Sequence, residues 1–199
     1  MEKTLKGFIL GIIVAVIVIA GGAYAVIAAG LIPANADAAA GPVERFVART
    51  DLRAVLRNLA PKDANPTPLT DDNLIAGIKL YGQHCAICHG TVSGEAPPIA
   101  RGQYPKPPQL AKDGVEDDPE GWTFWKIKHG IRWTGMPAWK DEINDQDIWK
   151  LTLFLKNMDQ LSPAAKQAWQ ALALPSAAAS LSPDTPDTSG SAAPGKPAQ

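Results

Sequence analysis

Two cysteines and a histidine stand together near the middle of the chain, in the run Cys85-Ala86-Ile87-Cys88-His89. On a helical turn, residues three and four positions apart lie on one face, so both thiols and the imidazole can reach the same flat ring. This spacing predicts covalent attachment of a c-type haem through two thioether bonds. We therefore predict one covalent haem c bound by Cys85 and Cys88, with His89 as an axial ligand to the iron.

Two other kinds of site use a Cys-x-x-Cys spacing. A redox-active dithiol is expected in a strand-helix-strand unit, and residues 77–90 show no such pattern. A zinc site needs four ligands, but the chain has only two cysteines and three histidines, without a second ligand pair at the usual spacing. Haem attachment is the interpretation that we favour.

The second axial ligand is sought among the three methionines. Met1 precedes a long apolar segment and Met158 falls near the end of an expected helix, whereas Met136 lies in a loop-forming run between a glycine and a proline. We predict Met136 as the second iron ligand, because a methionine held between these residues is fixed in place. The alternatives are that Met136 only fills the core, or that His84 or His129 is the ligand.

An uncharged and largely apolar segment spans residues 7–32. About 20 such residues suffice to cross the hydrocarbon core of a bilayer. Lys3 and Lys6 precede the segment, so the positive-inside rule places the N-terminus in the cytoplasm and the haem domain on the periplasmic side of the cytoplasmic membrane. We predict a transmembrane anchor over residues 1–33; the alternative is a signal peptide that is cleaved at the small residues just after it.

Residues 34–69 are predicted to form a linker that contains an amphipathic helix over residues 42–60. Arginines recur at every fourth position of this helix, at Arg45, Arg49, Arg53 and Arg57. That spacing places positive charge along one side. A row of this kind is usually a solvated face, although its position after the anchor also allows contact with lipid headgroups or a partner protein.

The haem domain is predicted over residues 70–160. Thr70 is expected to cap a helix that begins at Asp71 and leads into Cys85. Further helices are expected at residues 122–131 and 145–158, and we expect an aromatic side chain of the latter to pack over Gly77. A short helix is expected within residues 161–175, and residues 176–199, rich in Ala, Ser, Pro, Thr and Gly, are expected to be disordered.

Charge composition limits the partners. The chain carries 19 Lys and Arg against 20 Asp and Glu, which argues against nucleic acid. Basic residues flank Met136, namely Lys126, Lys128, Arg132 and Lys140, while residues 113–120 are acidic and are expected to be solvated. The two groups would form a charge dipole that orients an acidic redox partner, unless they are ordinary solvated charges.

These motifs, in this order, resemble class I c-type cytochromes of the membrane-anchored bacterial single-haem type. The matching parts are Gly77 and Tyr81, the Cys-x-x-Cys-His run, Pro108-Gln109-Leu110, Met136 and Trp149. The segment Ile127 to Trp139 also resembles cytochrome subunits of respiratory complexes. The resemblance implies an all-α cytochrome c fold in which the Pro108 carbonyl accepts a hydrogen bond from His89. We also expect Tyr104 and Trp133 in the haem pocket.

The implied function is transfer of single electrons between respiratory-type redox partner proteins, by a free carrier or a subunit of a membrane complex. We expect no enzymatic activity and no catalytic residues. A haem enzyme or gas sensor is the alternative, and it requires an exchangeable iron position such as a weakly bound Met136 would leave. The sequence contains no flavin or nicotinamide motif that would favour an enzyme, and it leaves the electron donor and acceptor open.

Overall fold

The computed structural model describes residues 2–172. Every regular element in that part of the chain is helical, which confirms the predicted all-α class. In chain order the elements are α1 (Glu2–Ala28), α2 (Pro42–Leu59), α3 (Asp71–His84), α4 (Ala86–His89), α5 (Pro98–Gly102), α6 (Glu120–His129), α7 (Asp145–Lys156), the short 3-10 helix η1 (Met158–Gln160) and α8 (Pro163–Gln170). The expected disordered tail lies outside the described residues.

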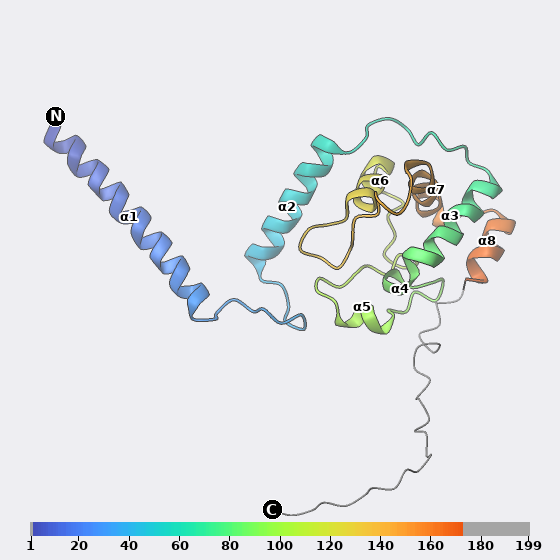
Figure 1. Ribbon diagram of the computed structural model, residues 1–199, viewed down its shortest axis with the longest axis horizontal. Coiled ribbons are helices and arrows are strands. Elements are labelled where there is room, and N and C mark those ends of the chain that lie inside the picture. The colour runs from blue at the N-terminus through green and yellow to red at the C-terminus, as the bar shows by residue number, and fades with distance from the viewer. Residues whose placement is uncertain (1, 173–199) are drawn as a thin grey trace, which may run out of the picture.

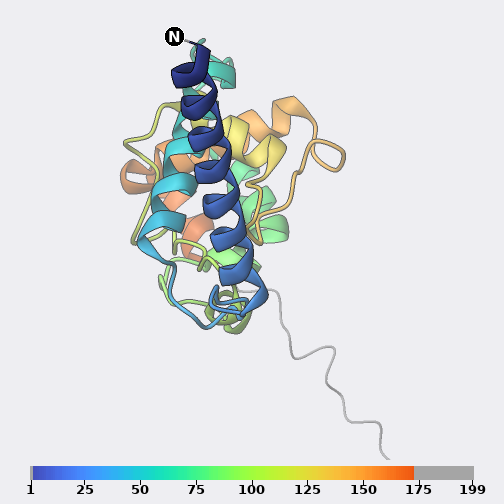
Figure 2. The ribbon, with the colours of Figure 1, turned by 90° about the vertical axis from the view of Figure 1, so that its left-hand side faces the viewer.

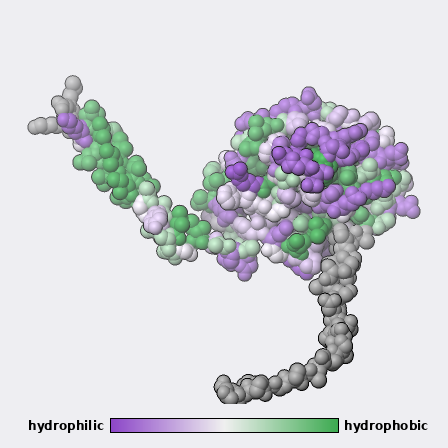
Figure 3. All heavy atoms as spheres, in the orientation of Figure 1, coloured by the Kyte–Doolittle hydropathy of each residue, from purple (hydrophilic) through white to green (hydrophobic). Residues whose placement is uncertain are grey.

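The N-terminal helix α1 stands apart from the rest of the described chain (Figure 1). Its residues Thr4–Ala28 are long and apolar enough to cross a membrane, and none of that stretch is buried in the protein. Figure 3 shows it as a hydrophobic rod beside a domain of mixed and largely hydrophilic surface. Length and composition agree with a membrane anchor or a signal sequence alike.

The core of the haem domain lies between α3, α7 and α8. Tyr81, Phe154 and Trp169 meet edge to face or tilted, with ring centroids 5.2 to 5.6 Å apart. A side chain at Gly77 would clash with the Lys150 carbonyl and lie 2.9 Å from Phe154 Cβ, so α3 and α7 touch at this point. The prediction that an aromatic residue of α7 packs over Gly77 is confirmed.

The C-terminal end of α2 packs against the haem domain. Leu56 and Ala60 are buried, and the backbone of Pro61 approaches Gly121 at the start of α6 so closely that no side chain fits there. The Asn65 amide donates hydrogen bonds to the Glu120 carboxylate and to a main-chain carbonyl of α7. Figures 1 and 2 show the chain turning after α1 and running back along α2.

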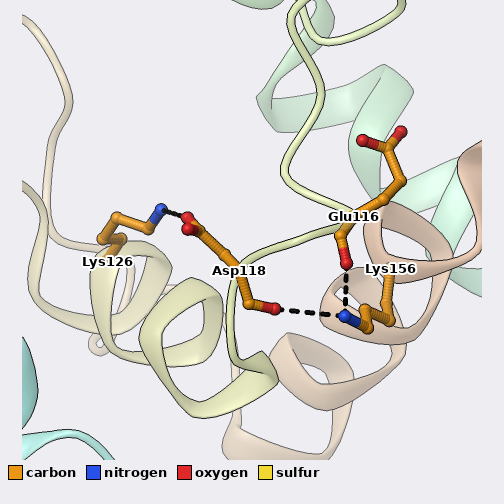
Figure 4. A network of polar contacts seen from close by, with 4 residues as sticks. All are labelled: Glu116, Asp118, Lys126 and Lys156. Carbon is orange, nitrogen blue, oxygen red and sulfur yellow. Dashed lines mark hydrogen bonds and ion pairs between the residues drawn. The ribbon is translucent and has the colours of Figure 1, made fainter.

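The acidic stretch at residues 113–120 is not merely solvated, which corrects the expectation from sequence. The Lys126 ammonium lies 2.7 Å from the Asp118 carboxylate, and Lys156 donates hydrogen bonds to the main-chain carbonyls of Glu116 and Asp118 (Figure 4). The stretch thus bridges α6 and α7. It does so through one carboxylate, that of Asp118, and through two main-chain carbonyls.

Candidate haem site

A mainly apolar cleft with about 730 Å³ of empty space, part of it open to solvent, lies beside α4. Its lining comes from the junction of α3 and α4, from the loop at residues 103–108, and from the segment between residues 127 and 139. Cys85, Cys88, His89 and Met136 all line it. The four side chains singled out by sequence are therefore gathered in one cleft.

The first wall of the cleft is the turn that carries the cysteines and His89. The Cys85 carbonyl accepts main-chain hydrogen bonds from Cys88 at 3.0 Å and from His89 at 2.9 Å, which closes one helical turn. The two cysteines are not joined by a disulfide. Burial, and to a smaller degree the neighbouring Cys88, raises the pKa of Cys85 to about 12, so this thiol is neutral at physiological pH.

The orientation of the His89 ring is set by one hydrogen bond. Nδ1 lies 2.9 Å from the carbonyl oxygen of Pro108, the contact that the family resemblance implies. A carbonyl only accepts, so Nδ1 carries the proton and Nε2 keeps a free lone pair. Burial lowers the pKa of His89, against the opposing effect of the Pro108 hydrogen bond, which favours the neutral imidazole that a metal ligand requires.

Two residues that sequence reasoning did not place in the site support this wall. The hydroxyl of the fully buried Tyr81 donates to the carbonyl of Gly90 at 2.9 Å, just after α4. The Gln109 amide donates to the carbonyls of Cys88 at 3.2 Å and Pro107 at 3.1 Å, and so joins the wall to the proline loop. The sequence did contain a signal for Tyr81, because the hydroxyl of a tyrosine in the core needs a hydrogen-bond partner.

The second wall is the loop that carries the half-buried Met136. The Thr134 hydroxyl accepts from the Met136 N–H at 3.1 Å and donates to the Ile131 carbonyl at 2.7 Å. The Ile131 N–H in turn donates to the Met136 carbonyl at 3.2 Å. These three hydrogen bonds close the loop on itself and fix the backbone from which the thioether projects.

Gly130 joins this loop to the end of α6. Its φ is +66°, a conformation that L side chains rarely adopt. A Cβ here would lie 2.6 to 2.7 Å from the main chain of residues 136–138, so only glycine lets the Met136 segment pass so close. Helix α6 consequently ends at His129, two residues before the expected boundary.

The two other predicted pocket residues do not line the cleft. Tyr104 instead donates a hydrogen bond to the Glu44 carboxylate of α2. Trp133 is 89% exposed at the tip of the Met136 loop and has a φ of +63°. Of the competing histidines, His84 lines the cleft with its ring 5.0 Å from Trp139, whereas the exposed His129 packs beside Trp125.

The basic residues near Met136 are not a free positive patch. Lys126 is paired with Asp118 of the acidic stretch itself, and Lys128 lies 2.8 Å from the carboxylate of Asp145. For Lys126 the prediction of a positive charge separated from the acidic stretch is wrong. Arg132 is exposed and forms no ion pair within the described residues.

The donor set fits a c-type haem. Two thiols, one neutral imidazole with a free Nε2 and one thioether line a single apolar cleft, and a histidine with a methionine is the ligand pair of cytochromes c. Within residues 2–172, no three His, Cys, Asp or Glu side chains gather as a site for a simple metal ion. The zinc alternative therefore has no geometric support.

Comparison with protein families agrees with the site. Residues 72–155 match the family model of cytochrome c oxidase, cbb3-type, subunit III. This match, together with the all-helical fold, shows that the chain contains a c-type cytochrome domain, a class that carries haem c and serves electron transfer.

Among solved structures, a chain of the reducing HAO-like protein complex of Kuenenia stuttgartiensis is similar at 25% sequence identity, with a TM-score of 0.40. The alignment covers 49% of this chain and 50% of that chain, so the chain matches about half the length of this neighbour. A comparison with curated proteins finds no match.

Proposed function

We propose that the chain is a membrane-anchored monohaem cytochrome c that carries single electrons between redox partners at the outer face of the cytoplasmic membrane. It acts as a free carrier or as a subunit of a respiratory-type complex. The match to an oxidase subunit supports the electron-transfer role, and the apolar α1 behind Lys3 and Lys6 supports the topology. In this proposal residues 1–33 are the anchor, 34–69 the linker and 70–160 the haem domain, which is followed by helix α8.

The observation that carries this proposal is the donor set in the cleft. Cys85 and Cys88 would hold the haem through thioether bonds, and His89 and Met136, which line the same cleft, would ligate its iron. When bound, the haem supplies an iron that takes up and releases one electron. The Pro108 carbonyl keeps Nε2 of His89 unprotonated and available for ligation. A thioether ligand from Met136 would favour the reduced iron and so raise its potential.

The way in which Met136 is held supports a carrier rather than an enzyme or a sensor. An enzyme or sensor needs a ligand that leaves the iron readily. The main-chain N–H and carbonyl of Met136 are both hydrogen-bonded within its loop, and Gly130 packs against the same backbone. The loop is thus built to keep the thioether in one place while an electron enters and leaves.

Substitution of Met136 by Ala tests the assignment. The variant should lose any methionine-to-iron charge-transfer band, have a lower reduction potential and bind carbon monoxide, because one axial position is then open. Absorption spectra and a potentiometric titration measure these changes.

Met158→Ala is the matched control, since Met158 lies in η1 and does not line the cleft. It should keep the parent spectrum and potential. Retention of the parent spectrum in Met136→Ala would show that another residue is the ligand.

A further inference from the structure

The two ends of α2 have different surroundings. Near its C-terminal end Leu56 is only 3% exposed, because it packs on the haem domain. Every residue from 42 to 51 is exposed, including Val43 at 73%, Phe46 at 70% and Val47 at 57%. Val43 lies three and four positions before Phe46 and Val47, so these three apolar side chains lie on one uncovered side of the helix.

Positive charge lies along the same side. Arg53 and Arg57 follow Phe46 by seven and eleven residues, which at 3.6 residues per turn returns both to its side of the helix. Neither arginine forms an ion pair in the part of the chain that the structure describes. Apolar side chains accompanied by unpaired arginines are the composition of a helix that lies in a membrane interface.

A linker of limited length joins α2 to the apolar helix α1. Residues 29–41 form this linker and span at most about 45 Å even when fully extended. At the start of α2, Glu44 accepts the hydrogen bond from Tyr104, and at its end Leu56 and Ala60 pack on the domain. The C-terminal end of α2 is therefore packed on the haem domain, and Glu44 adds one exposed hydrogen bond near its start, while the outer side stays uncovered.

We propose that Val43, Phe46, Val47, Arg53 and Arg57, here called the outer face of α2, lie on the bilayer that α1 crosses. The arginines would bind anionic lipid headgroups, and the apolar side chains would enter the boundary between headgroups and acyl chains. This inference rests on the proposed membrane anchor. Because the arginines of the outer face are positively charged, an anionic lipid surface is the complementary binding partner.

Docking of this face has a consequence for the haem site. Tyr104 belongs to the loop at residues 103–108, which forms part of the cleft, and its hydroxyl contacts the first turn of α2. Adsorption of α2 would therefore hold this side of the cleft close to the membrane. Electrons would then be exchanged with a partner embedded in the same membrane more readily than with one that arrives from solution.

Hydrogen-deuterium exchange tests the proposal on the full-length haem-loaded protein in lipid nanodiscs. One set of discs contains phosphatidylcholine alone, and the other also contains phosphatidylglycerol. The amides of residues 43–51 should exchange more slowly in the anionic discs, because this unpacked half of α2 opens easily when nothing covers it. Peptides from α8 should exchange equally in both and serve as the internal reference.

The double variant Arg53→Gln, Arg57→Gln should lose the protection given by anionic discs. Each arginine near an anionic surface raises the membrane partition coefficient by a factor of about five, so removal of both should lower that coefficient about 25-fold. Lys79→Gln with Lys166→Gln is the matched control, because it also removes two exposed positive charges but from α3 and α8. Its α2 exchange should equal that of the parent.

Three results would overturn the proposal. Equal exchange of α2 in both kinds of disc would exclude an anionic lipid surface. Protection seen only in native membranes, and not in discs free of other proteins, would identify the outer face as a protein docking surface. A mature protein whose mass lacks residues 1–33 would remove the anchor, and it would overturn the proposed topology as well; the first two results, with α1 intact, leave that topology standing.

Discussion

The two walls of the cleft are held in different ways. The wall with His89 rests on a buried aromatic core, since Tyr81 packs against Phe154 and Trp169 and also hydrogen-bonds the chain just after α4. The wall with Met136 lies at the edge of the core, where Met136 and Trp139 are only partly buried. It is a loop closed by three hydrogen bonds and seated against Gly130.

This contrast separates stability from ligation. Disturbing the wall of His89 should lower the free energy of unfolding of the whole domain, because the same residues form its core. Disturbing the wall of Met136 should change how firmly the thioether is held while most of the fold remains. The predictions below are chosen to break or to sharpen that separation, beginning with the largest expected effect.

Substitution of Gly77 by Ala should lower the free energy of unfolding more than any other variant proposed below. The added Cβ would clash with the Lys150 carbonyl and lie 2.9 Å from Phe154 Cβ, so α3 and α7 must move apart. The overpacking should exceed the gain of about 1 kcal/mol in helix propensity, for a net loss of about 2 kcal/mol in the free energy of unfolding. Chemical denaturation followed by circular dichroism measures it.

Gly102 provides the control for that substitution. It lies in α5 with an ordinary φ and open space around the position of its Cβ. Gly102→Ala should change the free energy of unfolding by no more than about 0.5 kcal/mol. Equal losses in the two variants would contradict a tight contact between α3 and α7.

Gly130→Ala should act mainly on the wall of Met136. The left-handed backbone costs an alanine about 1–2 kcal/mol, and its Cβ would push against the main chain of residues 136–138. We expect weaker ligation by Met136, seen as an affinity for added imidazole that rises by on the order of tenfold, since 1.4 kcal/mol corresponds to a factor of ten. Titration with imidazole, followed by absorption, measures this.

Gly94→Ala separates backbone strain from displacement of the loop. Gly94 has a similar φ of +63°, but a Cβ there would meet only the flexible side chain of Lys112. This variant should be destabilised to a similar degree while its imidazole affinity stays at the parent value. An equal rise in affinity in both variants would mean that general destabilisation, rather than Gly130, controls the ligand.

The parts of this structure that sequence predicts are those set by local spacing. The Cys-x-x-Cys-His run closes one helical turn, and Thr70 caps α3 as expected, with its hydroxyl 3.3 Å from the Asn73 N–H. The close contact of α7 with Gly77 was predictable, because a glycine inside a helix needs a contact that compensates for its cost in stability. The helical class follows from the same periodic patterns.

The parts that escaped prediction depend on contacts between distant segments. The hydroxyl of Tyr104 hydrogen-bonds to Glu44, sixty residues away in the sequence. Trp133 has a positive φ that no local sequence pattern predicts. Leu56 is buried only because the chain after α2 folds back onto α6. The end of α6 at Gly130 could have been predicted from the sequence, because helices commonly end at a glycine.

The smallest and sharpest comparison removes one hydroxyl from each wall. Thr134→Val loses the hydrogen bonds to the Met136 N–H and the Ile131 carbonyl, at a cost of about 1 kcal/mol, and should raise the affinity for imidazole about fivefold because the loop opens more often. Tyr81→Phe leaves the Gly90 carbonyl without its buried donor and should lower the free energy of unfolding by about 1–2 kcal/mol. Its imidazole affinity should stay at the parent value, because the fully buried Tyr81 lies outside the Met136 loop. If Tyr81→Phe instead raised the affinity as much as Thr134→Val, the two walls would open as one unit, and ligation would report the stability of the whole domain rather than that of the Met136 loop.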